Sequence, residues 1–207
     1  MTRLLLVRHG QTEWNCQQRY QGHSDVPLDT TGEQQALQLA GRLSREPIDA
    51  VFSSDLKRAA ATARPIAARH QLDVQHTPRL REMNFGVFEG LTYTEVQSTY
   101  PQDLAAWEAN RNQPPPGGES FASLIDRLSA FGAEVRDSCS TQNVLVVGHG
   151  GSLRVLLCLL LGLTPEKHWQ FKVDPASWSE ISLYDTGAIL SRLNDTYHLE
   201  AYTDYAG

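Results

Sequence analysis

The sequence predicts an α/β protein, a three-layer α/β/α sandwich with a mostly parallel central sheet and a helical lid insertion. Short apolar runs alternate along the chain with stretches whose apolar residues recur at helical spacing. The apolar runs are nearly continuous, as is typical of strands covered on both faces. Two of them, 4–7 and 144–147, are followed closely by a histidine and a glycine. Ligands of open α/β sheets bind at such strand ends.

The first elements are a strand, a long loop and a helix. Residues 4–7 are apolar and predict the first strand, which ends before a loop over 10–31. After Thr31-Gly32, four apolar residues recur at helical spacing, and Pro47 stops the helix that they predict. They are Ala36, Leu39, Ala40 and Leu43.

The alternation continues beyond Pro47. Residues 50–52 predict the second strand, and the turn 53–55 leads into an Ala-rich helix through Ala68. Residues 72–74 predict a third strand. The later elements are an amphipathic helix, a strand, a helix and a hairpin. Their residues are 121–135, 144–147, 153–161, and 180–184 with 188–193 around Asp185-Thr186-Gly187.

The stretch 91–118 interrupts the alternation of strands and helices. It contains helical pieces at 92–98 and 102–110, followed by the Pro/Gly run 114–118, which cannot continue a helix. We expect this insertion to form a lid over the pocket. Its aromatic residues could stack on a substrate or hold the lid on the core, and we favour core packing. They are Tyr93, Tyr100 and Trp107.

Composition narrows the protein class. The chain of 207 residues fits one domain, 1–207, and its 41% hydrophobic content supports a globular core. A net charge of −6 without a basic stripe argues against nucleic-acid binding. No apolar stretch is long enough to span a bilayer, and no signal peptide precedes the first strand. Three scattered cysteines favour a reducing compartment, so we expect a cytoplasmic protein.

The polar residues after the first strand belong to a longer pattern. Val7-Arg8-His9-Gly10-Gln11-Thr12, with Asn15 downstream, resembles the signature of the histidine phosphatase superfamily. Further matching segments follow in order, and the resemblance weakens after about Gly162. These segments are Tyr20-Gln21-Gly22, Pro27-Leu28, Thr31-Gly32, Ser53-Ser54-Asp55-Leu56-Lys57-Arg58-Ala59, Leu80-Arg81-Glu82, Phe85-Gly86, Glu89-Gly90, Pro116-Gly117-Gly118-Glu119-Ser120 and Val147-Gly148-His149-Gly150-Gly151.

The resemblance implies a role for each matching residue. His9 is the expected nucleophile, and Glu82 is the expected proton donor to the leaving alcohol and later the base for water. Arg8, Arg58 and His149 are expected to form the phosphate pocket. Further phosphate or substrate contacts are expected from four residues, namely Asn15, Gln21, Gly22 and Gly150. A homodimer formed through a sheet edge or hairpin is the oligomer that the family suggests.

The chemistry of these side chains supports the same roles. A neutral imidazole can attack phosphorus, and neighbouring cations disfavour its protonated form. Arg8 and Arg58 supply such cations, and each guanidinium can bind two phosphate oxygens. Phosphoryl transfer needs mainly positioning and stabilisation of oxygen charge. We therefore expect an enzyme that needs neither a metal nor a cofactor.

Other interpretations of these residues were weighed. His9, His149 and Glu82 could form a His₂Glu zinc site, but two adjacent arginines would repel a divalent cation. Glu89 and Glu95 could compete with Glu82 for the acid–base role. The remaining histidines have no support from the pattern and are expected at the surface or in ordinary packing, although His23 follows Gln21-Gly22. They are His23, His70, His76, His168 and His198.

The predicted reaction is hydrolysis of a small phosphate monoester through a phosphohistidine. A phosphoglycerate mutase is less favoured, because 92–113 contains one basic residue, Arg111, and three acidic ones. Among phosphatases the chain resembles the alpha-ribazole phosphatases and the metal-independent phosphoserine phosphatases, although the latter have a histidine where Phe85 stands. Alpha-ribazole 5'-phosphate is the first substrate candidate, with phosphoserine and broad specificity as alternatives. A catalytically silent phosphate-binding protein would normally have lost a core residue.

Overall fold

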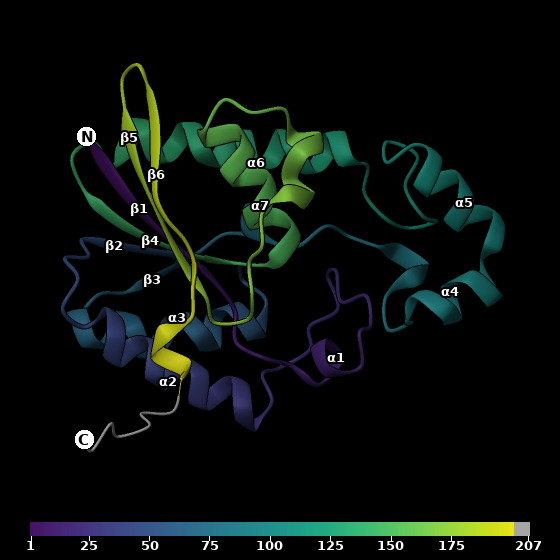
Figure 1. The fold of residues 1–207 in the computed structure, drawn as a ribbon, viewed down its shortest axis with the longest axis horizontal. Helices are drawn as coiled ribbons and strands as arrows, with labels where there is room; N and C mark the ends of the chain where they lie inside the picture. The colour runs from purple at the N-terminus through teal and green to yellow at the C-terminus, as the bar shows by residue number, and fades with distance from the viewer. Residues whose placement is uncertain (201–207) are drawn as a thin grey trace, which may run out of the picture.

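The computed structural model describes residues 1–200 and has the predicted three-layer architecture. Helices α2 (Thr30–Leu43) and α3 (Lys57–His70) cover one face of a six-stranded sheet, while α6 (Phe121–Ser138) and α7 (Gly150–Leu160) cover the other (Figure 1). The strand order is β3-β2-β4-β1-β5-β6. The strands are β1 (Thr2–Arg8), β2 (Ala50–Ser53), β3 (Val74–His76), β4 (Asn143–Gly148), β5 (Trp178–Tyr184) and β6 (Gly187–Asp195).

The sheet is parallel over its first four strands. β1 pairs with β4, and β2 pairs with both β4 and β3, in parallel. The predicted hairpin, β5 and β6, adds two antiparallel strands beside β1. The first strand therefore has a neighbour on each side, and its carboxyl end lies beside that of β4.

The side chains of the central strands alternate between the two faces of the sheet, and this divides the core into two clusters. Leu4 and Leu6 of β1 pack on the side of α6 and α7, whereas Leu5 and Val7 pack on the side of α2 and α3. Because successive strand side chains point to opposite faces, a continuous apolar run can fill both clusters. This explains why the strand sequences are apolar throughout.

The main helices begin and end close to the predicted residues. The predicted helix after Thr31 is α2, which begins at Thr30 because the Asp29 carboxylate accepts a hydrogen bond from the Gly32 N–H. The Ala-rich helix is α3, which continues past Pro65 to His70. The bounds are α2 (Thr30–Leu43), α3 (Lys57–His70), α6 (Phe121–Ser138) and α7 (Gly150–Leu160).

Two predicted boundaries were wrong, and the first of them matters for the site. The last helix of the sandwich, α7, begins at Gly150 rather than at residue 153, so its first turn contains Gly150, Gly151 and Ser152. The third strand occupies 74–76 rather than 72–74, because Gln71 adopts a left-handed conformation (φ 57°) and Leu72 N–H bonds back to Ala67 O. Residues 71 and 72 therefore complete the end of α3.

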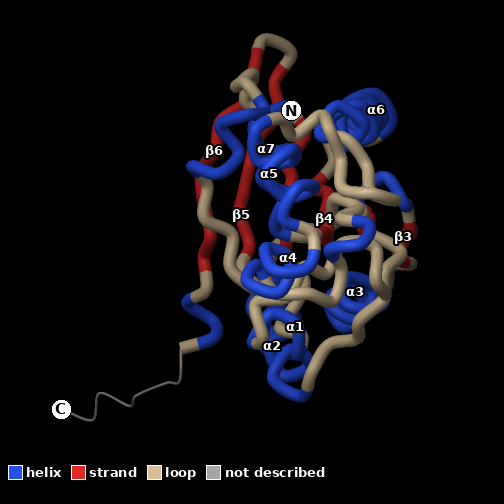
Figure 2. The backbone as a smooth tube through the Cα atoms, turned by 90° about the vertical axis from the view of Figure 1, so that its right-hand side faces the viewer, coloured by secondary structure: helices blue, strands red, loops and turns tan. Residues whose placement is uncertain are grey.

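The lid and the first loop gather at one end of the sandwich. The short helices α4 (Tyr93–Thr99) and α5 (Pro101–Ala109) form the insertion, and both figures place them at the same end as α1 (Glu13–Cys16). Helix α1 is one short turn within the segment 10–31, which was predicted as a loop. Figure 2 shows these helices in front of the sheet. The 3₁₀ turns are η1 (Pro78–Leu80), η2 (Gly86–Phe88), η3 (Pro165–Gln170) and η4 (Tyr197–Leu199).

The aromatic residues of the insertion mostly pack against the core. Trp107 is 6% exposed, and Tyr100 packs against Phe88, as the core-packing interpretation predicts. Tyr93 is exposed and donates a hydrogen bond to Glu108. No helix within residues 1–200 has both the length and the apolar character needed to cross a bilayer.

Candidate active site

Two histidines from non-adjacent segments meet at the carboxyl ends of β1 and β4. The register of these strands pairs Arg8 with Gly148, so His9 and His149 leave the sheet side by side. The main-chain N–H of His9 donates a hydrogen bond to Gly148 O at 3.0 Å, and the centroids of the two imidazole rings lie 5.1 Å apart. The predicted juxtaposition of the two histidines is therefore present.

The His9 ring is held in one tautomer. Its Nδ1 lies 2.7 Å from the carbonyl oxygen of Gly10, which can only accept, so Nδ1 carries the proton. The remaining nitrogen, Nε2, then has the lone pair. Burial lowers the pKa of His9 well below its usual value, and the charges of Arg58 and Arg8 add to that effect. His9 is thus a neutral imidazole with a nucleophilic Nε2.

Arg58 is buried at the start of α3 and fixed by main-chain carbonyls. Its two terminal nitrogens donate to Ser24 O and Gly22 O, each at 2.7 Å, and its Nε lies 3.2 Å from His149 Nδ1. Burial lowers the pKa of Arg58 to about 10, so the guanidinium stays charged at neutral pH. The loop that contains Gly22 therefore holds this cation against the histidine pair.

The partners of His149 identify a residue that the sequence analysis missed. Its Nδ1 accepts from Arg58, so its proton lies on Nε2, which lies 2.9 Å from the Ser54 hydroxyl. Burial, followed by Arg58, lowers the pKa of His149 well below its usual value. Ser54 was predicted in a turn and within a segment of the family pattern, but without a role in the site. Its position directly after a strand beside β4 is the signal that could have identified it.

Arg8 occupies the other side of the histidine pair. One terminal nitrogen donates to Val173 O at 2.7 Å, and its buried Nε has no partner within residues 1–200. Gly150 allows this approach, because a Cβ there would lie 3.3 Å from the guanidinium carbon. Burial lowers the pKa of Arg8. Two guanidinium groups therefore flank His9, as expected for an anion pocket.

Glu82 reaches the site from the irregular segment after η1. One of its carboxylate oxygens accepts from Gly151 N–H at 2.7 Å, and the other accepts from Ser152 N–H at 2.9 Å and Met83 N–H at 3.0 Å. The first turn of a helix stabilises a carboxylate placed there. The early start of α7 thus positions the Glu82 carboxylate.

The competing glutamates have structural contacts instead. Glu89 accepts from the main-chain N–H groups of His23, Ser24 and Phe85, and Glu95 pairs with Arg19. Neither lines the cavities beside the histidines, whereas Glu82 lines both. Its position therefore favours Glu82 among the three.

The residues from the first loop divide into two groups. Asn15 and Gln21 line a cavity of about 160 Å³ that contains the paired histidines and arginines. The Asn15 Oδ1 accepts from Thr12 N–H at 3.0 Å. Gly22 and Gly150 do not line this cavity. Gly22 O instead accepts a hydrogen bond from Arg58, and Gly150 leaves room for the guanidinium of Arg8.

A larger cavity of about 570 Å³ adjoins the small one. Tyr20, Glu82 and Phe85 line both cavities, and the Phe85 and Trp107 rings lie 5.8 Å apart across the aromatic wall. The larger cavity also has a charged side, which the sequence analysis did not predict. That side contains Arg111, Arg154, Glu166 and His168.

The described residues show no cluster suited to a metal ion. Within residues 1–200, no three His, Cys, Asp or Glu side chains come together as a potential ligand set. The cations beside His9 are guanidinium groups. The arrangement can bind a tetrahedral anion, supply a neutral imidazole nucleophile, and place a carboxyl group beside a chamber for the rest of the ligand.

Comparisons with known proteins agree with this geometry. The family profile described as "Histidine phosphatase superfamily (branch 1)" matches residues 4–196. The chain is 40% identical to phosphoserine phosphatase 1 of Hydrogenobacter thermophilus over 96% of this chain and 95% of that protein. It is 36% identical to the adenosylcobalamin/alpha-ribazole phosphatase of Escherichia coli K12, over 93% and 95%. The crystal structure of the alpha-ribazole phosphatase from Shigella flexneri superposes with a TM-score of 0.88 at 35% identity, covering 93% of this chain and 96% of that one.

Proposed function

The chain belongs to the histidine phosphatase superfamily, and we propose that it hydrolyses the phosphate monoester of a small metabolite through a phosphohistidine on His9. Its similarity to named phosphatases makes it a phosphomonoesterase, so the proposal concerns the residues and the substrate. The observation that carries it is the pair of cavities that share Glu82, one lined by His9 and three arginines, Arg8 and Arg58 among them, and one lined by aromatic residues.

In the first proposed step, the phosphoryl group moves from the substrate to His9. The Nε2 lone pair attacks phosphorus, the bond from phosphorus to the alcohol oxygen breaks, and the Glu82 carboxyl group gives its proton to that oxygen. Arg8 and Arg58 stabilise the charge on the phosphoryl oxygens. The alcohol leaves into the larger cavity.

In the second proposed step, water replaces the histidine. Glu82, now a carboxylate, accepts a proton from water while the water oxygen attacks phosphorus. The bond from phosphorus to Nε2 breaks, which restores neutral His9 and releases inorganic phosphate. His149, held by Arg58 and Ser54, completes the wall of the phosphate cavity.

We favour a substrate with a large, ring-bearing leaving group, and alpha-ribazole 5'-phosphate is the first candidate. The larger cavity provides about 570 Å³ with Tyr20, Phe85 and Trp107 on its wall, which suits a flat base. A relative with an alpha-ribazole phosphatase name supports this choice. Phosphoserine is the second candidate, because Arg111 and Arg154 in the same cavity suit a carboxylate.

We propose a cytoplasmic location and no macromolecular partner for the reaction. All three cysteines, Cys16, Cys139 and Cys158, are free, and two of them are buried, which supports a reducing compartment. The homodimer stays a prediction, and β6 forms the exposed edge at which it would be sought.

The test is phosphate release by the wild type and His9→Ala. The substrates are alpha-ribazole phosphate, phosphoserine, 3-phosphoglycerate and 4-nitrophenyl phosphate. We expect His9→Ala to lose activity on all four, and the wild type to prefer one by about 100-fold, or about 2.7 kcal/mol. Similar slow turnover of all four would indicate broad specificity. A fully active His9→Ala enzyme would overturn the proposed nucleophile.

A further inference from the structure

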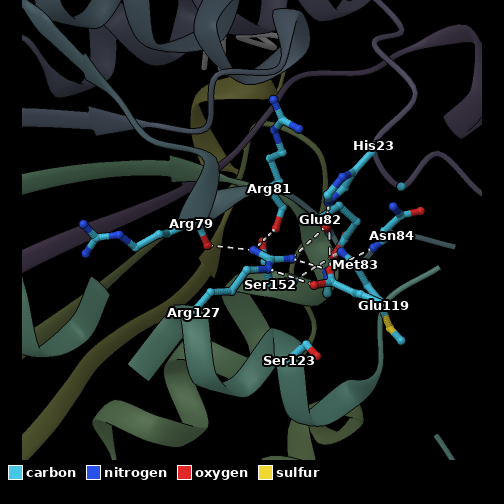
Figure 3. Close-up of polar contacts among 12 residues, drawn as sticks. His23, Arg79, Arg81, Glu82, Met83, Asn84, Glu119, Ser123, Arg127 and Ser152 are labelled. Carbon is cyan, nitrogen blue, oxygen red and sulfur yellow. Dashed lines mark hydrogen bonds and ion pairs between the residues drawn. The ribbon is translucent and has the colours of Figure 1, made fainter. Parts of the chain in front are cut away.

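Arg127 of α6 uses three of its five guanidinium N–H donors on the segment that presents Glu82. One terminal nitrogen donates to Arg79 O and Arg81 O, both at 2.7 Å, and the other donates to Glu82 O at 2.9 Å. Figure 3 shows the guanidinium among these carbonyls. A half-buried guanidinium that binds three main-chain carbonyls of one short segment fixes the path of that segment.

The remaining donors of Arg127 bind Glu119, which holds the far side of the same segment. Nε and one terminal nitrogen lie 3.1 and 2.7 Å from the two carboxylate oxygens. Glu119 in turn accepts from Asn84 N–H at 2.9 Å, and its own N–H donates to Asn84 O at 3.0 Å. All five N–H donors of the guanidinium are therefore used, and both sides of Glu82 are held.

Glu82 needs this support because its segment has little regular structure. η1 ends at Leu80, and η2 begins only at Gly86. The Glu82 carbonyl receives Arg127 and also His23 Nε2 at 3.0 Å, while its carboxylate is held by the start of α7. The residue is thus fixed at both its main chain and its side chain (Figure 3).

We propose that Arg127 is the positioning residue that places the Glu82 carboxyl group at the leaving oxygen, an inference that rests on the proposed function. Arg127 lines neither of the two cavities, so it acts through Glu82. The planar fork of arginine matches several carbonyls at fixed angles, whereas lysine offers three donors at one point. A lysine at this position would keep the positive charge but would lose the simultaneous hydrogen bonds to the three carbonyls.

The distinguishing measurement is the dependence of kcat/KM on the leaving group. An alkyl phosphate needs a proton on its departing oxygen, whereas 4-nitrophenyl phosphate departs as a stable anion. We expect Arg127→Lys to lower kcat/KM for an alkyl phosphate by about 10- to 100-fold, within the usual contribution of general acid catalysis. We expect a change of less than about threefold for the nitrophenyl ester.

Arg136→Lys is the matched control, because Arg136 lies on the same helix, is exposed and makes one long contact to Tyr184 O at 3.4 Å. The kcat/KM values of Arg136→Lys for the alkyl phosphate and for the nitrophenyl ester should both match those of the wild type. Glu119→Gln keeps the shape of the residue that Arg127 binds but removes its charge. It should lower kcat/KM for the alkyl phosphate by less than Arg127→Lys does, and should leave kcat/KM for the nitrophenyl ester nearly unchanged. It also provides the test if Arg127→Lys folds poorly, as judged by thermal unfolding.

Glu82→Gln separates failure of this inference from failure of the proposed function. If Glu82→Gln slows only the alkyl ester and Arg127→Lys slows neither ester, the positioning role is wrong and the Glu82 role stands. If Arg127→Lys slows both esters equally, Arg127 supports the whole pocket and the inference is overturned. If Glu82→Gln shows no selectivity, the proposed acid–base role itself is wrong.

Discussion

At the scale of single residues, the site depends on two buried histidines that stay neutral. Desolvation and the adjacent arginines both disfavour the protonated rings, and hydrogen bonds to Gly10 O and from Arg58 Nε fix the tautomers of His9 and His149. The nucleophilic role proposed for His9 needs the unprotonated ring, and burial favours that form. The same burial links folding to pH.

The linkage gives a prediction for stability. The folded pKa values of His9 and His149 lie below the unfolded value, so below about pH 6.5 the unfolded chain takes up protons that the folded protein does not. The free energy of unfolding should therefore fall as the pH falls. When the pH falls from 6 to 5, the free energy of unfolding, measured with urea, should decrease by about 1 kcal/mol less for His9→Gln than for the wild type.

The exposed His76 supplies the control for that experiment. His76→Gln should follow the wild-type dependence of stability on pH. Parallel curves for the wild type and His9→Gln would show that His9 takes up its proton equally in the folded and unfolded states, contrary to the neutral histidine inferred here.

The residue scale also separates what the sequence could show from what it could not. His9, Arg58 and His149 follow strands or open a helix within a recognisable pattern, and the structure brings them together. Arg127 lies in the middle of an amphipathic helix and looks there like an ordinary solvated residue. Its importance depends on which carbonyls face it after folding, and a one-dimensional pattern does not contain that information.

At the scale of elements, the insertion 91–118 is joined to the segment after Glu82 by a close backbone contact. Gly86 has φ +53°, and a Cβ there would lie 2.1 Å from Pro116 O and 2.5 Å from Gly118 N. The Val87 N–H also donates to Pro116 O at 3.0 Å. The Pro/Gly connector after the lid therefore packs directly on the segment that follows Glu82.

We expect Gly86→Ala to reduce stability by about 1–3 kcal/mol, since it combines left-handed strain with a clash against rigid backbone. Urea unfolding measures the loss. Gly187→Ala is the control, because a Cβ at Gly187 would meet nothing within 4 Å. An equal effect of the two substitutions would mean that the connector moves aside and the contact is not needed.

Element boundaries show why the sequence predicted the helices better than their ends. The periodic apolar residues of the last sandwich helix begin at Leu153, but the helix itself begins three residues earlier. Gly150 and Gly151 have no apolar side chains, so the spacing of apolar residues could not predict that they are helical. Those residues are the ones that approach Arg8 and Glu82, and hence the boundary error fell on the site.

At the scale of the whole molecule, the positive charge of the site is local. The chain has a net charge of −6, yet the buried guanidinium of Arg58 and the half-buried guanidinium of Arg8 flank His9. These fixed cations can stabilise a phosphoryl group without a metal ion. We therefore expect phosphate release to be unchanged by excess chelator. Loss of activity on chelation, restored by adding zinc or magnesium, would contradict this expectation.

The pairing of β1 has a consequence for how the chain folds during synthesis. The first strand is made first, but its two neighbours, β4 and β5, are made only after about 140 and 175 residues. Contacts of such high sequence separation close large loops and slow folding. The nascent chain must therefore carry the apolar strand Thr2–Arg8 without its partners until most of the protein has been translated. A shortened chain that ends before Trp178 should leave one edge of β1 open, and so should be prone to aggregation rather than partially active.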